Sequence, residues 1–398
     1  MLRLRFVALV VWAVGVQVHE LIGTIGLAAF VVSSLPEVRR LSLPALRVWE
    51  PLWLFIGWSL VAPTLTGQPP NGTGLARTLD WAVIPLVAHA ASTLTSAQWR
   101  TLAVAAFSTL ALSCVVAGLQ HFGLWPPEST FESMRWMKAS FSRVYEPIGD
   151  SGRFMGGGLL FHRLKFAHVS GLVLVGVALL LPRKDLRERG LLVVLAAFAF
   201  VAVWLFPHAR MGAVAMTAGL GATLVMASPS RQRAIFTVGA LGVVALLVVL
   251  LVPSLRERFG AALSDQGSGQ RTQHLAAGLE AVKQHPLAGV GPGQFRPSKF
   301  AGPDMAEHVK ENPGKAHNQF LSMAAETGVL GAILFVVLLG WLAARARSLE
   351  LGALTVGGLV QFAVLSLAHD PLFQAPYSQG LVLLLGLGLS AGSRAPRG

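Results

Sequence analysis

Three basic side chains in the polar parts of this chain have the chemistry of a transfer reaction: His317, Arg210 and Arg271. An imidazole with a pKa of about 6.5 can act as a general base at neutral pH, and nearby cations keep it in the proton-accepting form. A guanidinium forms bidentate hydrogen bonds with phosphate oxygens, which a lysine ammonium does not match. Each residue alone also has a structural alternative, because a histidine can cap a helix and an arginine can extend toward lipid headgroups.

The elements around these residues place all three at one surface of a membrane. Arg210 lies in a very tight hairpin between two apolar runs, where a cation is costly unless it is paired or lines a water-filled cavity. Arg271 begins an amphipathic segment, 270–285, that is expected to lie along the membrane surface. His317 comes immediately before an apolar helix expected over Phe320–Ala343. The sequence therefore predicts that the three side chains share the outer surface.

A second basic set surrounds the start of the apolar run 158–181. Arg153, Arg163 and Lys165 could bind separate phosphates, although positions i and i+2 of a helix diverge. An ordinary solvated helix face explains the same pattern equally well. We therefore treat these residues as candidates for substrate binding only.

Three further residues are candidates for binding substrate through polar groups. Gly289 and Gly291 could present backbone N–H groups to a phosphate, but a run of this kind more often forms the turn after a helix, here one ended by Pro286. Asn318, next to His317, carries a side-chain amide at the mouth of the following helix.

The composition predicts an all-α polytopic membrane protein. Hydrophobic residues make up 54% of the 398 residues and charged residues 13%, whereas about a quarter of a soluble domain is charged. The apolar residues form blocks of about the length that spans a bilayer, and only helices satisfy their own backbone there. We expect about twelve spans in one integral membrane domain over 1–398, at roughly 5–19, 20–35, 49–66, 79–95, 101–123, 158–181, 190–206, 211–228, 234–252, 319–343, 350–369 and 379–391.

The basic residues predict which side of the membrane each loop faces. The short loops on the side of both termini are all basic, which makes that side cytoplasmic. The first span follows Arg3 and Arg5 without a cleavage site, so we expect it to remain attached. Many other basic residues fall in two outer loops, a smaller one at 124–157 and a large one at 253–318. Long loops can carry any charge, but the pattern also suits an outer face that handles a polyanion.

The sequence does not point to a metal or a cofactor. It contains no Asp-x-Asp motif of the kind that holds a divalent metal against a diphosphate, and no helix has zinc-ligand spacing. Cys114 is the single cysteine, so a disulfide within the chain is excluded.

A motif spread over about 60 residues resembles the signature of O-antigen ligases and related O-antigen polymerase-like proteins. Its parts are Arg271, the run His285-Pro286-Leu287-Ala288-Gly289-Val290-Gly291-Pro292-Gly293-Gln294-Phe295, then His317-Asn318-Gln319-Phe320-Leu321, and Glu326-Thr327-Gly328-Val329-Leu330-Gly331. Arg210 resembles the second arginine of that family. The chain departs from the family pattern at His274, where an aromatic residue is usual near this point, and at Ala209, where serine is frequent.

The resemblance implies a glycosyltransferase of the GT-C type in the bacterial inner membrane, with its active site facing the periplasm. It implies transfer of O-antigen from undecaprenyl diphosphate to lipid A–core, with inversion at the anomeric carbon and without metal or cofactor. His317 would be the base, and Arg210 and Arg271 would stabilise the departing diphosphate. The expected partners are this donor, this acceptor and membrane lipids, with no nucleic acid.

Other functions remain open at this level. An O-antigen polymerase would use the same donor with another lipid-linked glycan as acceptor, and a protein O-oligosaccharyltransferase would transfer the glycan to protein. A transporter of lipid-linked oligosaccharides would bind the diphosphate without chemistry, but transporters of that kind usually contain internal repeats, which this sequence does not show.

Overall fold

The computed structural model describes residues 2–38, 47–65, 67–125, 146–149, 151–183, 185–262, 265–300, 302 and 315–390. Over these residues the chain is helical, with no named strand and one isolated bridge between Pro147 and Phe154. Much of the predicted outer loops, including 126–145 and 303–314, lies outside the described residues. The all-α prediction is confirmed for the described part of the chain.

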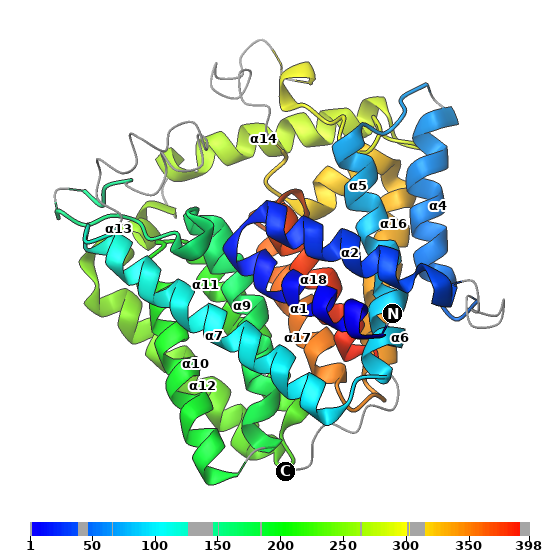
Figure 1. Ribbon diagram of the computed structural model, residues 1–398. Helices are drawn as coiled ribbons and strands as arrows, with labels where there is room; N and C mark the ends of the chain where they lie inside the picture. Colours follow the sequence, from blue (N-terminus) through cyan, green and yellow to red (C-terminus); the bar gives the residue numbers. More distant parts are fainter. Residues whose placement is uncertain are drawn as a thin grey trace.

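The helices follow the apolar blocks of the sequence (Figure 1). They are α1 (Leu2–Val18), α2 (Glu20–Val38), α4 (Glu50–Leu65), α5 (Gly72–Asp80), α6 (Ile84–Ser92), α7 (Ser96–His121), α9 (Arg163–Leu180), α10 (Leu186–Leu205), α11 (Arg210–Ala227), α12 (Arg231–Leu251), α13 (Pro253–Ala262), α14 (Asp265–Gln284), α16 (Gln319–Ala346), α17 (Gly352–Ser366) and α18 (Ala375–Gly388). Short 3₁₀ turns include η1 (Trp81–Val83), η4 (Gly158–Leu160), η5 (Leu181–Arg183), η6 (Pro297–Lys299) and η7 (Pro371–Phe373).

Within the described ranges, six segments are long and apolar enough to cross a membrane, which makes this a multi-pass membrane protein. They are Glu20–Glu37, Ser96–His121, Arg163–Arg183, Arg187–Leu205, Arg210–Ala227 and Gln319–Ala346. Two shorter apolar helices, Ile235–Leu251 and Gly352–Ser366, also coincide with expected spans. The predicted span 79–95 is not one α-helix, because the three residues of η1 separate the end of α5 at Asp80 from α6, which has Pro85 in its first turn. The count of twelve therefore stays a prediction.

The first two helices form a hairpin whose backbones lie very close together. A Cβ atom added at Gly15 would meet the backbone of Ile22 and Gly23, and one added at Gly26 would meet the backbone of Trp12. Small residues permit such close packing between helices in a membrane, where dispersion contacts replace the hydrophobic effect.

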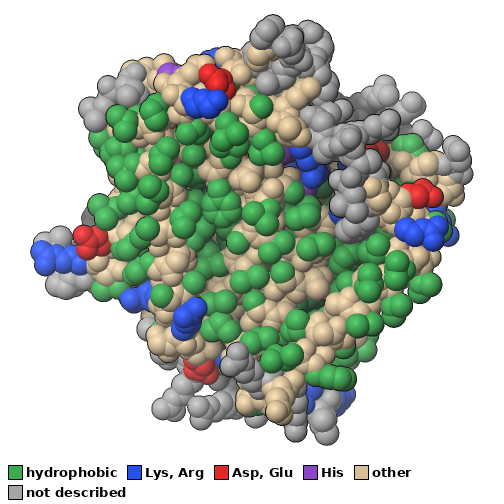
Figure 2. All heavy atoms as spheres, turned by 180° about the vertical axis from the view of Figure 1, so that it is seen from behind, with side chains coloured by type: hydrophobic (Ala, Val, Ile, Leu, Met, Phe, Trp, Pro, Cys, Tyr) green, Lys and Arg blue, Asp and Glu red, His purple; other side chains and the backbone are tan. Residues whose placement is uncertain are grey.

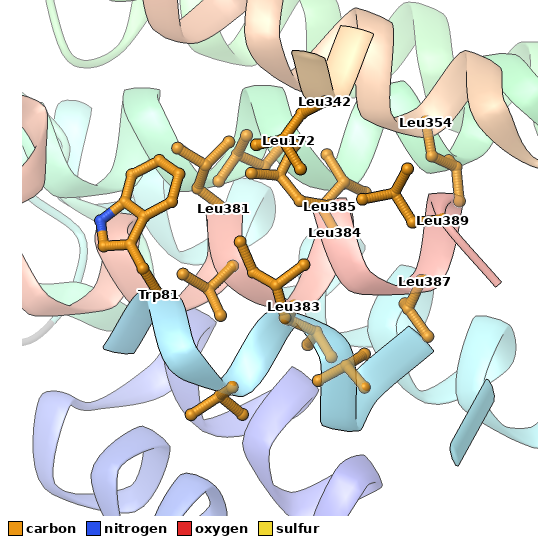
Figure 3. Packing of buried hydrophobic residues seen from close by; sticks show 14 of the residues in the cluster. Trp81, Leu172, Leu342, Leu354, Leu381, Leu383, Leu384, Leu385, Leu387 and Leu389 are labelled. Carbon is orange, nitrogen blue, oxygen red and sulfur yellow. The ribbon is translucent and has the colours of Figure 1, made fainter. Parts of the chain in front are cut away.

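The core is built around α18, which is buried along its whole length. Leu381, Leu384 and Leu385 of α18 pack among leucines of α9, α16 and α17 (Figure 3), and Trp81 lies in the same cluster. The opposite view of the molecule shows hydrophobic side chains over most of the middle of one face, with charged side chains mainly at its margins (Figure 2). This distribution is the one expected of a surface that faces lipid.

Helix α14 crosses one end of the helical bundle instead of running along it (Figure 1). Helices α9, α11 and α16 begin at this same end. The N-terminus of a helix carries a partial positive charge from its unpaired N–H groups, so three helices add positive potential where α14 lies. The fold thus brings the sequence-predicted basic residues to one end of the molecule.

Candidate active site

His317 lies in the last turn before α16, in a conformation that few non-glycine residues adopt. Its φ angle is 55°. The chain on both sides is fixed, because the Ala316 N–H donates to the Ser322 hydroxyl at 3.2 Å and the Asn318 carbonyl Oδ1 accepts the Leu321 N–H at 3.0 Å. Backbone conformations of this kind cost energy and cluster at functional sites. Because its side chain accepts the Leu321 N–H, Asn318 is the N-cap of α16. Its contact with substrate stays a prediction.

The His317 imidazole lies among positive charges. Its ring contacts that of His274 at 4.8 Å between centroids, with the two planes at 86°. Burial, followed by the positive charges of His274, Arg271 and Lys315, lowers the pKa of His317 to about 4. The imidazole is therefore neutral at physiological pH and available to accept a proton. A nearby polyanion would raise this pKa and make the ring a stronger base.

Arg163, Arg210 and Arg271, which we call the arginine group, come together from three helices. Arg271 and Arg163 are the charges that act most strongly on the Arg210 guanidinium. Arg163 forms an ion pair with Glu146 at 3.1 Å, whereas Arg271 has no acidic partner among the described residues. Positive charges held close together repel one another, and a bound anion would offset this repulsion, so the arginine group is a candidate anion-binding site.

The imidazole of His369 is acted on by some of the same charges. Burial holds the pKa of its imidazole well below the ordinary value, and His168, Arg271, His317 and Arg163 lower it further. The His168 and His369 rings lie 5.4 Å apart. A neutral imidazole, that of His369, therefore lies within reach of the charges of Arg271 and Arg163.

A different arrangement of charges lies beside Lys315. The Lys315 ammonium stands over the Phe373 ring at 4.3 Å, and the Arg77 guanidinium lies against the same ring at 3.8 Å. The pKa of Lys315 is lowered to about 8, mainly by burial; the negative charge of Asp370 opposes the shift, and the positive charge of Arg77 contributes to it. Lys165, whose charge also reaches Lys315, forms an ion pair with Glu20. We call Lys165, Lys315, Glu20 and Asp370 the lysine–carboxylate group.

Asp370 was not among the residues that the sequence indicated. It precedes η7, and the turn is tied to α16 because the Leu372 N–H donates to the Gln319 side-chain carbonyl at 3.1 Å. Asp370 is 5% exposed. Burial raises its pKa to about 6, against the opposing effects of the Ser322 hydroxyl and the Lys315 charge. A carboxylate directly before a proline at the end of an apolar run was the signal available in the sequence.

The glycine-rich part of the signature packs against a break in α16. Gly328 has φ 75° and ψ 174°, which interrupts the helix. The Val290 and Gly291 N–H groups donate to the carbonyls of Ala325 and Glu326, both at 2.9 Å. The Val329 N–H donates to the Pro286 carbonyl at 2.8 Å. Irregular backbone inside a membrane protein has to find such partners, so the loop and the helix complete each other.

Two side-chain contacts fasten the same region, which we call the helix-break knot and define as residues 286–293 with 325–329. Trp58 donates from Nε1 to the Thr327 carbonyl at 2.9 Å. Glu326 forms a buried ion pair with Arg77. Arg77 of α5 is thus joined to α16 within the helix-break knot.

The backbone of Gly289 and Gly291 is engaged within the protein. The Gly289 N–H donates to the His285 carbonyl at 3.1 Å, and the Gly291 N–H donates to α16. Both glycines have positive φ angles, 69° and 95°. The alternative reading of this run as a turn accounts for these contacts, and binding of a phosphate by its N–H groups would require them to break.

Arg153 is an exposed residue that lies over the Phe122 ring at 5.4 Å. In the described residues it contacts neither the arginine group nor the lysine–carboxylate group. Arg163 and Lys165 do lie near the site, where the charge of Arg163 acts on Arg210 and that of Lys165 acts on Lys315. These different partners agree with the divergence of positions i and i+2.

An apolar cavity of about 710 Å³ lies elsewhere, between α1, α7, α9 and α18. None of the residues proposed above lines it. Within the described ranges, no group of three His, Cys, Asp or Glu side chains is placed to hold a metal ion.

The fold and the site together define a class: a multi-pass helical membrane protein in which arginines and a histidine converge at one end of the helical bundle. Residues 195–336 match the family model of the O-antigen ligases, a segment that contains Arg210, Arg271 and His317. The resemblance to an O-antigen ligase/polymerase-like family is thereby confirmed over these residues. No curated protein matches the chain.

Proposed function

We propose that this protein is an inverting, metal-independent glycosyltransferase that moves O-antigen polysaccharide from undecaprenyl diphosphate to lipid A–core in lipopolysaccharide biosynthesis. The active site faces the periplasm from the bacterial inner membrane. One observation carries the proposal: the positive charges of Arg271 and Lys315 both act on His317, whose imidazole is held neutral. The family match over residues 195–336 supports the same class of reaction.

The reaction is a single displacement at the anomeric carbon of the donor. The acceptor hydroxyl oxygen forms a bond with that carbon while the bond to the diphosphate oxygen breaks, and the configuration inverts. The hydroxyl proton goes to His317, and undecaprenyl diphosphate leaves. Negative charge grows on the departing diphosphate, where preorganised donors are most effective.

The arginine group supplies that stabilisation. Arg210 lies in the first turn of α11 and Arg271 in α14, so their guanidinium groups are held by two separate helices. A bound diphosphate would also offset the charges that lower the pKa of His317. Donor binding would therefore raise the pKa of the base toward the pH of the periplasm, which couples binding to catalysis.

The test is transfer by purified protein supplied with undecaprenyl-diphosphate-linked glycan and lipid A–core in the presence of EDTA. We expect a ladder of glycan on lipid A–core. Lengthening of the lipid-linked glycan would instead establish a polymerase, and transfer to protein would establish a protein oligosaccharyltransferase. Transport of the donor without any covalent product would contradict the enzymatic proposal.

A further inference from the structure

The arginine group and the lysine–carboxylate group differ in the signs of the charges that act within them. Within the described residues, the charges acting most strongly on Arg210 are both arginines, Arg163 and Arg271. The charges acting on Lys315 alternate in sign, since Asp370 and Glu326 are negative while Arg77 and Lys165 are positive. His317 is reached by one member of each side, Arg271 and Lys315.

This difference separates two kinds of ligand. A diphosphate only accepts hydrogen bonds and is repelled by carboxylates, so it is favoured at the arginine group. A sugar hydroxyl both donates and accepts, so it is best satisfied by a carboxylate and an ammonium together. The lysine–carboxylate group offers both.

The lysine–carboxylate group is built from separate elements that hold it in place. Lys315 is fixed over the Phe373 ring, which Arg77 contacts as well. Glu20 comes from the tip of the α1–α2 hairpin and pairs with Lys165 in the first turn of α9. Asp370 comes from the turn before α18.

Polar capacity remains on this side after the contacts within the protein are made. Lys315 has three N–H donors. Within the described part of the chain, the Lys315 ammonium forms no hydrogen bond and no close ion pair. It contacts the face of the Phe373 ring, and Asp370 is the charge that acts on it most strongly. Glu20 keeps a 45% exposed side chain although it pairs with Lys165.

We propose that the lysine–carboxylate group is the acceptor subsite: it binds the hydroxyl groups of the acceptor sugar and presents one of them to His317. The inference rests on the proposed function. It assigns each substrate to one group: the donor diphosphate to the arginine group and the acceptor sugar to the lysine–carboxylate group. Lys315 is a binding residue in this account, and Phe373 positions it.

The experiment measures the KM of donor and acceptor separately for Lys315→Met, Lys315→Arg and Glu20→Gln. We expect Lys315→Met to raise the KM for lipid A–core about 10- to 100-fold, the range for hydrogen bonds of a charged group, and to leave the KM for the donor unchanged. Lys315→Arg should recover part of the loss. Glu20→Gln should raise the acceptor KM by a smaller factor, because Glu20 is half-exposed.

Lys283→Met is the matched control, because Lys283 is a lysine of the same outer region with a 75% exposed side chain. It should change neither KM. Unchanged acceptor KM in Lys315→Met and Glu20→Gln, or a rise in the donor KM alone, would overturn the acceptor subsite while leaving the transfer reaction established. A wild type that forms no product would overturn both proposals, and melting temperatures equal to wild type exclude misfolding of the variants.

Discussion

The helix-break knot and the arginine group each contain residues of the family signature, Gly328 in the knot and Arg271 in the arginine group, but they use their polar groups in opposite ways. In the knot, backbone groups released by the break at Gly328 are bound by the loop and by Trp58. In the arginine group, like charges face one another, and Arg271 has no acidic partner among the described residues. The signature therefore combines a structural half, which satisfies the backbone at the helix break, with a charged half whose proposed role is to bind an anion.

The largest effect that separates the two halves is expected for Arg271→Ala. Removing one preorganised donor to a developing charge typically lowers kcat by about 10²- to 10³-fold. The free energy of unfolding should hardly change, because Arg271 has no ion pair to lose within the described residues. Transfer rates and melting temperatures of the same preparation measure both quantities.

Arg100→Ala is the control for this prediction, because Arg100 is an exposed arginine at the start of α7, away from the site. It should keep the wild-type rate. A large loss of stability in Arg271→Ala would place that arginine in the structural half and break the comparison.

The structural half is tested by Gly328→Ala. Gly328 has a φ of 75°, and an added Cβ would meet the Leu287 carbonyl. Forcing a side chain into this conformation costs about 1–3 kcal/mol, before the contact with the loop is counted. We expect a lower melting temperature, measured by thermal unfolding in detergent, with kcat per folded molecule affected far less than in Arg271→Ala.

Gly340→Ala provides a matched control in the same helix, because no atom lies within 4 Å of the added Cβ. Alanine is favoured over glycine inside a helix by about 0.5–1 kcal/mol. Its melting temperature should therefore stay the same or increase. Equal losses in both variants would mean that the break at Gly328 has no special structural role.

The smallest effect is the dependence of stability on pH that His317 introduces. The pKa of His317 is about 4 in the folded protein and about 6.5 in an unfolded chain, so between these values the unfolded chain binds a proton that the folded one does not. Stability should therefore decrease as the pH falls from 6.5 to 4. His317→Gln should show a shallower decrease of melting temperature over this window, and identical pH slopes would contradict the assignment.

The sequence predicted the helices well and the charge pairing poorly. An apolar block of about 20 residues is a strong sequence signal for a helix, so nearly every expected span coincides with a helix of the structure. The break at Gly328 was not predicted, because a single glycine inside an apolar run is also compatible with a continuous helix. The pairing of Arg77 with Glu326 was missed because the two residues lie 249 positions apart.

In the candidate site, too, the sequence predicted local features but not the contacts between distant residues. Arg210, Arg271 and His317 were identified individually from local position and from the family resemblance, and the structure places them around one another. Asp370 and the role of Lys315 were not, because they depend on how η7 docks on α16. Contacts between distant elements leave no periodic pattern in a sequence.

The most direct test of His317 as the base is the single-turnover rate of glycan transfer for wild type and His317→Ala, with both substrates saturating and EDTA present. General-base catalysis contributes about 10²- to 10⁴-fold, so we predict a loss of that size with donor binding retained. His89→Ala, which changes a histidine with a 47% exposed side chain that pairs with Glu37, should transfer at the wild-type rate. A His317→Ala protein that transfers glycan at the wild-type rate would contradict the account.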